Sequence, residues 1–321
     1  MRVPVTSENV NTLTQIAQVQ CGWITQVAWS PDGATLAVAG AEGIRLYVGS
    51  FGGAPTHVLE GHTGHVKGAV FSPANRIGLL LASWASDMTV KLWDAGDLKA
   101  GVREIVTLHG HTDSVDDAAF SPDADRLMLA SASADGTIRI WDLDRMEEKA
   151  VLRGHDQEVT SVTYALGGHV LVSGGRDHTV RLWDVESETE GTIFGHHDDW
   201  VREIRVNPPG TMIASASKDT SLRLWDAHSG ELYARIYAHA EGADCIAFSP
   251  DGALMVTGGR DNTVRLWDVE RILQQGHGTV EDAILEIRAH DKPVLSVAFH
   301  PGGTMLASAS GDNTVKLWAV G

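Results

Sequence analysis

Residues 248–268, FSPDGALMVTGGRDNTVRLWD, carry the pattern that decides the fold. Apolar and β-branched residues alternate with polar ones at a period of two, which is typical of β-strands. The tripeptides PDG and RDN interrupt this alternation and are typical of tight turns. The stretch therefore predicts the end of one strand followed by two further strands, with short turns between them.

The end of this stretch, Leu-Trp-Asp or a near variant, recurs along the whole chain. Its aromatic residue stands at Tyr47, Trp93, Trp141, Trp183, Trp225, Trp267 and Trp318. The successive spacings of 46, 48, 42, 42, 42 and 51 residues are close to the roughly 40–45 residues of one propeller blade. A weaker fourth strand follows the aromatic residue, as in 231–239. The repeat predicts seven units of four short strands each.

The coupled positions within these units resemble the WD40-repeat family over essentially the whole chain. In that family a His, a Ser or Thr, an Asp and a Trp form a hydrogen-bonded chain in each blade. The resemblance implies an all-β, closed seven-bladed β-propeller of four-stranded antiparallel blades. Carried over residue by residue, it gives six complete structural networks: His62, Ser83, Asp87, Trp93; His111, Ser131, Asp135, Trp141; His155, Ser173, Asp177, Trp183; His197, Ser215, Asp219, Trp225; His239, Thr257, Asp261, Trp267; and His290, Ser308, Asp312, Trp318.

His197 is chosen over His196 because its interval of 28 residues to Trp225 equals the His-to-Trp interval in three other units. The first unit departs from the pattern and has Gln20, Val38, Glu42 and Tyr47 at the corresponding places. We expect blade one to lack the network and to be held by packing alone.

The ends of the chain predict how the ring closes. Only three residues follow Trp318, which leaves no sequence for the outer strand of that blade. Residues 10–19, VNTLTQIAQV, show the alternation of an outer strand. The resemblance implies that this N-terminal strand completes the last blade. The expected organisation is an N-terminal tail at 1–9 and a single propeller at 10–321.

Composition limits the classes of function. The formal charge is −17, which makes nucleic acid an unlikely partner. There is no apolar run long enough for membrane insertion, and the two cysteines show no disulfide or zinc spacing. We expect a cytoplasmic protein that is a monomer or a subunit of a larger complex.

One face of the predicted propeller is built to a fixed length. We call it the template face: it carries the loops that lead into the first strand and the loops between the second and third strands. The interval from the network His to the end of the first strand is 9 residues in all six units that have the His. Insertions fall on the opposite face, and the largest is 271–284, with about nine extra residues. Both faces remain candidates for the main binding surface.

Three positions per blade on the template face are those that the family tends to use for binding. Because aromatic and Arg residues anchor binding hot spots, we select from them the candidate partner-binding residues Trp23, Lys67, Arg176, Trp200, Arg202, Lys218 and Arg260. Arg176, Trp200, Arg202, Lys218 and Arg260 cluster on blades four to six. This group, which we call the cationic sector, would orient an acidic partner. Asp116, Glu158 and Asp244 are close enough in the scheme to neutralise it.

The sequence favours a non-catalytic protein–protein interaction scaffold that docks a peptide or protein segment, in particular an acidic one. Two alternatives stay open: a propeller enzyme with chemistry in the central channel, and a nucleic-acid or sugar binder that uses exposed Trp side chains. The chain contains no recognisable catalytic motif. The pair His196 and His197 beside two aspartates suggests a metal site only superficially. We therefore predict no catalytic, cofactor-binding or metal-ligating residues.

Overall fold

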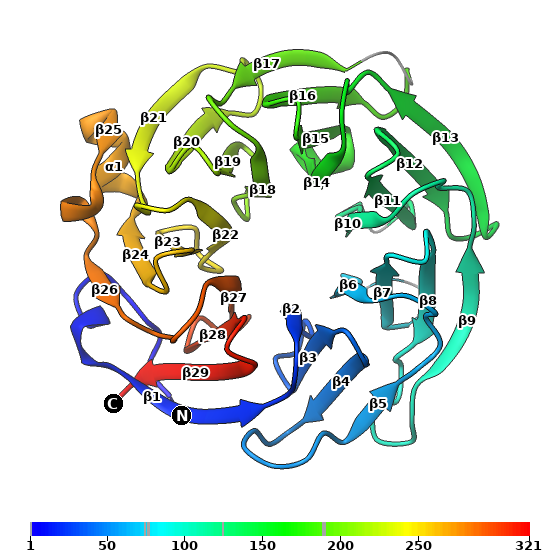
Figure 1. Cartoon of the computed structure of the whole chain (residues 1–321), viewed down its shortest axis with the longest axis horizontal. Helices are drawn as coiled ribbons and strands as arrows, with labels where there is room; N and C mark the ends of the chain where they lie inside the picture. Colours follow the sequence, from blue (N-terminus) through cyan, green and yellow to red (C-terminus); the bar gives the residue numbers. More distant parts are fainter. Residues whose placement is uncertain (1, 74, 76–77, 124, 188–190) are drawn as a thin grey trace.

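The chain folds into a ring of β-sheets around a central opening (Figure 1). The computed structural model describes every residue except 1, 74, 76–77, 124 and 188–190. The described residues form seven sheets, each built on four antiparallel strands with one strand at the opening and one at the rim. The predicted all-β, seven-bladed propeller with four-stranded blades is confirmed.

The blades follow one another in chain order. Blades one to three comprise β2 (Ile24–Trp29), β3 (Thr35–Gly40), β4 (Gly43–Val48), β5 (His57–Leu59); β6 (Val66–Phe71), β7 (Leu80–Ala85), β8 (Val90–Asp94), β9 (Arg103–Leu108); and β10 (Val115–Phe120), β11 (Met128–Ser133), β12 (Thr137–Asp142), β13 (Glu147–Arg153). Blades four to six comprise β14 (Val159–Ala165), β15 (Val170–Gly175), β16 (Thr179–Asp184), β17 (Thr192–His196); β18 (Val201–Val206), β19 (Met212–Ser217), β20 (Ser221–Asp226), β21 (Leu232–Tyr237); and β22 (Ala243–Phe248), β23 (Leu254–Gly259), β24 (Val264–Asp268), β26 (Leu285–Ile287). Blade seven comprises β27 (Val294–Phe299), β28 (Met305–Ser310), β29 (Thr314–Val320) and β1 (Leu13–Gln20).

The Ser-Pro-Asp-Gly segments form the turns that the sequence predicts. In blade six, Oδ1 of Asp251 accepts hydrogen bonds from Oγ of Ser249 at 2.5 Å and from the backbone N–H of Ala253 at 3.0 Å. Gly252 has φ 74°, in the left-handed region that glycine adopts without strain. The side chains therefore fix the turn between the inner strand and the next.

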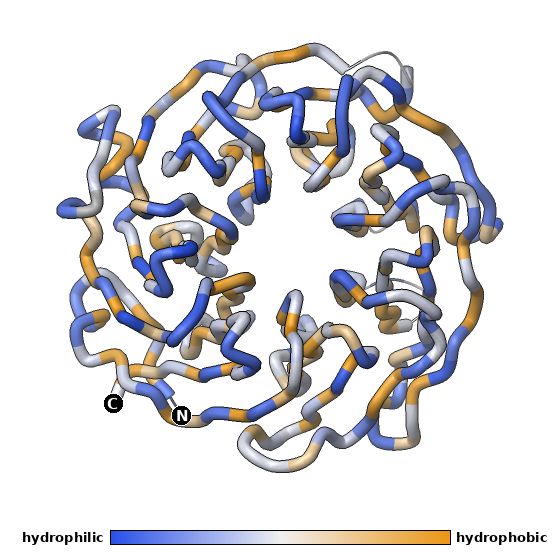
Figure 2. Tube along the Cα trace, viewed as in Figure 1, coloured by the Kyte–Doolittle hydropathy of each residue, from blue (hydrophilic) through white to orange (hydrophobic). Residues whose placement is uncertain are grey.

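The core lies between neighbouring blades. The second strand of each blade is almost wholly buried, as in β3, β7 and β23, whereas the outer strands, such as β13, are partly exposed. Figure 2 shows hydrophobic and hydrophilic residues mixed along the outer strands. Because the sheets stack face to face, every blade depends on its neighbours for burial.

The N-terminal strand closes the ring as expected. β1 pairs antiparallel with β29, in a register that runs from Leu13 opposite Val320 to Gln20 opposite Thr314. The strand begins three residues later than expected, because 10–12 form a short 3-10 helix. The side chain of Asn9 accepts a hydrogen bond from the N–H of Thr6 and donates one to the carbonyl of Pro4, which holds the chain in a turn before the strand.

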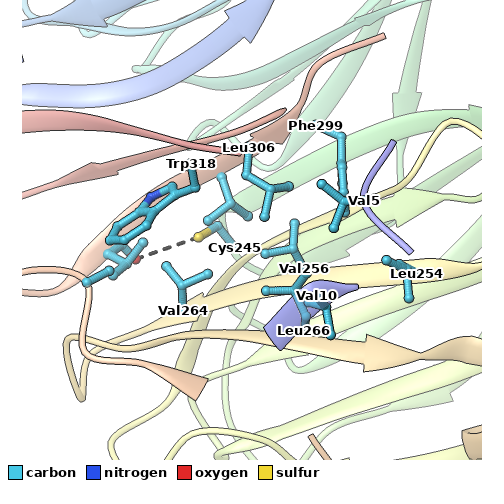
Figure 3. Close-up of a cluster of buried hydrophobic side chains, with 13 residues drawn as sticks. Val5, Val10, Cys245, Leu254, Val256, Val264, Leu266, Phe299, Leu306 and Trp318 are labelled. Atoms are coloured by element: carbon cyan, nitrogen blue, oxygen red, sulfur yellow. Dashed lines mark hydrogen bonds between the residues drawn. The ribbon is translucent and has the colours of Figure 1, made fainter. Parts of the chain in front are cut away.

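The segment before β1 packs between blades six and seven. The N–H of Val5 donates to the carbonyl of Gly303 at 2.9 Å. The side chains of Val5 and Val10 are buried in a cluster with Val256 of blade six and Trp318 of blade seven (Figure 3). The first residues of the chain therefore contribute to the core at the closing blade.

The 271–284 insertion adopts regular structure at the rim. Helix α1 (Val269–Gln275) starts directly after β24, with its N–H at Arg271 capped by the side chain of Asp268. The short strand β25 (His277–Gly278) then adds in parallel to β21 of blade five (Figure 1). The insertion thus joins blades five and six and is not a plain surface loop.

Candidate functional site

The six predicted structural networks are each brought together by the fold. In every set Nδ1 of the His lies 2.9–3.0 Å from a carboxylate oxygen of the Asp. The Ser or Thr oxygen lies 2.7–2.9 Å from Nε2 of the His and accepts a hydrogen bond from the indole N–H of the Trp at 2.8–3.0 Å. Each buried polar group is thereby satisfied, so these residues hold blade geometry and are occupied structurally.

Burial in four of the networks favours the neutral form of the imidazole. Burial lowers the pKa of His62, His197, His239 and His290, against the opposing effect of the neighbouring aspartates. Burial alone would raise the pKa of Asp87, but hydrogen bonds from Thr89 and His62 lower it to about 2. A neutral His with its proton on Nδ1 can donate to the carboxylate and accept from the hydroxyl at the same time.

Blade one has a smaller substitute for the network. The hydroxyl of Tyr47 lies 3.3 Å from Sγ of Cys21, and both side chains are buried. Val38 is fully buried at the place of the network Ser. The expectation that packing alone holds this blade is therefore incomplete, because this polar contact lies at the place of the network.

Sequence reasoning missed a second set of contacts that links the inner strands around the opening. These contacts are hydrogen bonds between neighbouring inner strands. At five interfaces within the described residues, the side chain of the third residue of one inner strand accepts a hydrogen bond from the backbone N–H of the fourth residue of the next inner strand. The pairs are Gln26 with Ala69, Asp117 with Val162, Ser161 with Ile204, Glu203 with Ile246, and Ser296 with Val27. These bonds set the positions of the inner strands relative to one another.

The template face is hollowed at the centre of the ring. The hollow, which we call the depression, has a volume of about 750 Å³. It is lined by Trp23, Thr25, Ala41, His65, Lys67, Asp116, Thr160, Arg176, Trp200, Val201, Arg202, Asp244, Arg260 and Leu295. Six of the seven candidate partner-binding residues are among them, and Lys218 stands next to the depression beside Trp200.

Trp200 is the centre of the cationic sector. Its ring centre lies 4.4 Å from the guanidinium carbon of Arg176, 4.5 Å from Nζ of Lys218 and 5.8 Å from the guanidinium carbon of Arg202. These distances fall within the range of cation–π attraction. The indole therefore gathers cations from blades four and five.

Each candidate cation also has a carboxylate beside it. Nε of Arg176 lies 2.9 Å from Glu158, and Nζ of Lys218 lies 3.2 Å from Asp199. The remaining pairs are Lys67 with Asp116 at 2.5 Å, and Arg202 and Arg260 with the same carboxylate of Asp244 at 3.4 and 3.2 Å. The neutralising acids expected from the sequence are therefore in place, with one shared between two arginines.

The contacts of the three arginines are made by one edge of the guanidinium. Arg176, Arg202 and Arg260 each approach their carboxylate through Nε. Among the described residues, none of their Nη atoms donates a hydrogen bond. An arginine carries five N–H donors in a planar fork, so most of this donor capacity stays open to a ligand.

Trp23 stands apart from this sector, on blade one. Its side chain is 58 % exposed, the largest exposure among the described large hydrophobic residues. It lines the same depression as Trp200. The depression thus combines a cationic side with an exposed aromatic side.

A narrower cavity, which we call the throat, continues from the depression into the central channel. It has a volume of about 130 Å³ and shares with the depression Thr25, Lys67, Asp116, Thr160, Arg202, Asp244 and Leu295. Its other lining residues are Gln26, Asp117, Ser161, Glu203, Arg205 and Ser296. These residues come later in the inner strands, so they lie deeper than the depression.

Arg205 crosses the throat between non-adjacent blades. Its Nη1 lies 3.3 Å from Oδ2 of Asp117 on blade three, and its Nη2 pairs with Glu203 on its own strand. Burial raises the pKa of Glu203 to about 7, and the negative charge of Asp117 acts in the same direction while Arg205 opposes it. Sequence reasoning missed this group. The sequence signal that could have found it is Arg205 itself, a charged residue at the fifth position of an inner strand, where the other units have Ala, Val or Thr.

The structure gives no support to a metal site near His196. Asp198 instead forms an ion pair with Arg235 at 2.9 Å, and His197 belongs to its structural network. Within the described part of the chain, no group of three or more His, Cys, Asp or Glu side chains is arranged to hold a metal ion. No described helix combines the length and the apolar character needed to span a bilayer.

Comparisons with known proteins agree with this architecture. The family model described as WD domain, G-beta repeat matches residues 11–47, 53–94, 102–142, 146–184, 187–226, 230–268 and 282–319. Each of the seven matches contains the aromatic residue of one unit.

Characterised proteins resemble parts of the chain. Nuclear distribution protein PAC1-1 of Uncinocarpus reesii is 36 % identical over 120 residues, which cover 36 % of this chain and 25 % of the relative. Transducin beta-like protein 3 of Bos taurus is 38 % identical over 114 residues, covering 35 % and 13 %. Guanine nucleotide-binding protein subunit beta of Zea mays is 28 % identical over 169 residues, covering 49 % and 43 %. The matches thus span less than half the length of each of these relatives. Because the family model matches most of the sequence, in seven successive repeats, this chain belongs to the WD domain, G-beta repeat (WD40) family.

Proposed function

We propose that this chain is a non-catalytic interaction scaffold that docks an acidic peptide or protein segment in the depression of the template face. The observation that carries the proposal is the arrangement of Arg176, Lys218 and Arg202 at 4.4–5.8 Å from the ring centre of Trp200. The resemblance to a guanine nucleotide-binding protein subunit supports it, since that name describes one component of an assembly.

The cationic sector is suited to bind oxyanions. Ion pairs and the indole of Trp200 restrict the motion of the cations before a partner arrives, so less side-chain entropy is lost on binding. The open Nη groups of Arg176, Arg202 and Arg260 match the two oxygens of a carboxylate. An acidic segment would therefore add hydrogen bonds without displacing the existing pairs.

The exposed side of Trp23 provides the second element of the proposed site. A large aromatic side chain that is 58 % exposed gains free energy when an apolar group of a partner covers it. The proposed partner segment thus carries acidic residues near blades four to six and an apolar residue near blade one.

The alternatives of the sequence analysis fit the site less well. A nucleic-acid or sugar binder would need free aromatic faces for stacking, but the ring of Trp200 is already approached by three cations. A net charge of −17 also opposes binding of a polyanion. For a channel enzyme, a turnover screen remains the direct test. We propose the cytoplasm as the location, in keeping with the free, buried thiols of Cys21 and Cys245.

The experiment compares partner binding by the wild type and by a variant with Arg176→Gln, Lys218→Gln and Arg260→Gln. Neutral substitutions are chosen because a Glu at these places would stand beside an existing carboxylate. A partner captured by the wild type is purified and its affinity is measured by titration calorimetry. We expect the triple variant to lose at least about tenfold in affinity, since each charged hydrogen bond contributes about 1.5–3 kcal/mol.

The matched control is the pair of substitutions Arg103→Gln and Arg145→Gln. Both side chains are more than 70 % exposed and lie outside the depression. The control should bind the partner like the wild type. Equal affinity of the wild type and the triple variant would refute docking in the cationic sector, provided that circular dichroism shows both to be folded.

A further inference from the structure

We infer that the free edge of β1 is a second docking surface, on which an extended segment of another protein adds as a further strand to blade seven. The segment places an apolar side chain in a hollow beside Ile16 and a carboxylate against Arg2. This surface lies at the rim of the ring (Figure 1), and the inference does not depend on docking in the depression.

The other outer strands carry features that protect a sheet edge from pairing with another chain. Among the described residues, β5 and β26 have three residues each, and β17 has five, one of which is Gly195. Charged side chains stand in β9, as Arg103 and Glu104, and in β13, as Glu147 and Lys149. The edge of β21 is covered by β25.

β1 is long and uncharged. It has eight residues, LTQIAQVQ, with no charged residue and no proline, and among the described strands it pairs with β29 alone. Its register shifts once, between Gln15 and Ala17, and then continues without interruption to Gln20. An edge of this kind can receive an extended peptide, whose main chain supplies the hydrogen bonds.

The backbone groups of Gln18 and Gln20 point away from β29. The N–H of Cys21 donates to the carbonyl of Asn313 at 3.0 Å, so the backbone of Cys21 turns toward β29. In an antiparallel pair, residues that bond to the partner strand alternate with residues that point outward. Gln20 and Gln18 stand at odd intervals before Cys21, so their N–H and C=O groups are the ones that an added strand would bond.

A hollow beside this edge gives room for a side chain of the added strand. Its volume is about 420 Å³, and its lining includes Ile16 and Ala17 of β1, Met305 of β28 and Phe51, which follows β4 in the chain. Ile16 is 39 % exposed. Residues directly opposite each other in paired strands share one face, with Cβ atoms about 4.5–5.5 Å apart. The residue opposite Ala17 in an added strand would therefore direct its side chain toward the hollow.

The charges near β1 favour a partner with a carboxylate. Arg2 is the one charged residue in the described lining of the hollow. Lys316 lies opposite Gln18 in β29, and its Nζ donates to the carbonyl of Ala289 at 2.7 Å, which leaves its charge uncompensated by that contact. Both are cations on a chain with a formal charge of −17. They attract an acidic side chain, whereas a second copy of this chain is repelled by its like net charge.

The test selects phage-displayed random peptides of twelve residues on the wild-type protein and discards those that also bind the variant Ile16→Lys with Gln18→Pro. The lysine puts a charge beside the hollow. The proline removes an outward N–H and leaves the bonds to β29, as an edge strand tolerates. We expect the remaining peptides to share an apolar and an acidic residue at a fixed spacing. If no peptide remains, and melting shows the variant to be folded, the inference is wrong.

Methylation of the peptide backbone distinguishes strand addition from other modes of binding, without any change to the protein. N-methyl groups at the alternate residues that face β1 should weaken binding at least about tenfold, because each removes a hydrogen-bond donor. Methylation of the residues between them should have much less effect. A uniform response along the peptide would rule out strand pairing.

Two further variants assign the contacts. Arg2→Gln should weaken binding of the acidic peptide but not of a peptide with the matching amide, and equal effects on both would refute the carboxylate contact. The matched control Ile105→Lys changes an isoleucine of β9 that is 41 % exposed and should bind like the wild type. If the wild type alone sediments as a dimer that Gln18→Pro dissociates, the edge belongs to a second copy of this chain and the inference is overturned.

Discussion

Nη1 of Arg205, on the inner strand of blade five, lies 3.3 Å from Oδ2 of Asp117, on the inner strand of blade three. The same guanidinium pairs with Glu203. The contact spans blade four, so the channel is braced by side chains as well as by the stacking of sheets. This arrangement places a fixed charge at the bottom of the throat.

Replacement of Arg205 by Met should destabilise the protein by about 3–5 kcal/mol, because two carboxylates would remain buried without their cation. The measurement is the free energy of unfolding from a denaturant titration. As a control, Arg103→Met removes a pair in which the arginine is 83 % exposed and should change stability by less than about 1 kcal/mol. Equal effects of the two substitutions would show that the contact across the channel does not stabilise the ring.

Substitution of a network hydroxyl should be costly. Ser173→Ala leaves Nε2 of His155 and Nε1 of Trp183 without the oxygen that both use at 2.7–2.8 Å. We expect a loss of about 1–3 kcal/mol for each unsatisfied buried group, measured as a fall in the free energy of unfolding. Ser229→Ala removes an exposed hydroxyl and should stay within about 0.5 kcal/mol; a comparable loss there would contradict the argument.

Glu203 should impose a pH dependence on stability. Since its pKa is raised from 4.5 to about 7 on folding, the folded protein holds a proton between these pH values that the unfolded chain has lost. The protonated carboxyl therefore makes its full contribution to the free energy of unfolding below pH 4.5, and this contribution is lost as the pH rises to 7. Its slope is at most about 1.4 kcal/mol per pH unit. Melting or denaturant curves from pH 4.5 to 8 should show this decline relative to Glu203→Gln, and parallel profiles would argue against the raised pKa.

The buried valines of the N-terminal segment should stabilise the closing blade. Val5→Ala with Val10→Ala removes two carbon atoms from each of two buried side chains. The expected cost is about 1.6 kcal/mol per valine, at about 0.8 kcal/mol for each buried carbon. Thermal unfolding monitored by circular dichroism measures it. Val3, which is 57 % exposed, provides the control Val3→Ala, for which no comparable shift is expected.

The sequence predicted those features that repeat. The positions of the network residues could be read because each recurs in six units at a nearly constant interval, and the closing strand followed from the absence of a fourth strand after Trp318. Arg205 could not be assigned a role in this way, because it occurs in one unit only. Its partner Asp117 lies two blades away, at a distance that no local pattern encodes.

In the candidate site, too, the recurring positions could be predicted from the sequence, whereas the contacts between blades could not. Trp200 and its cations were selected from positions that recur in each blade, and six of the seven candidates line one depression. Their mutual contacts could not be predicted, since Arg176 and Lys218 approach the indole from different blades. Helix α1 (Val269–Gln275), which leads into the 271–284 insertion, was missed because seven residues give too short a period to separate a helix from a loop.

The pairing of β1 with β29 has a consequence for biosynthesis. Gln20 lies opposite Thr314, and the ribosome adds the residues between them in about 15 to 60 s at 5–20 residues per second. During most of this interval the first strand has been made but lacks its partner, so its backbone groups are open to other chains once it has left the ribosome. Ring closure must therefore be among the last steps of folding, and a nascent chain should depend most on chaperones at its N-terminal end.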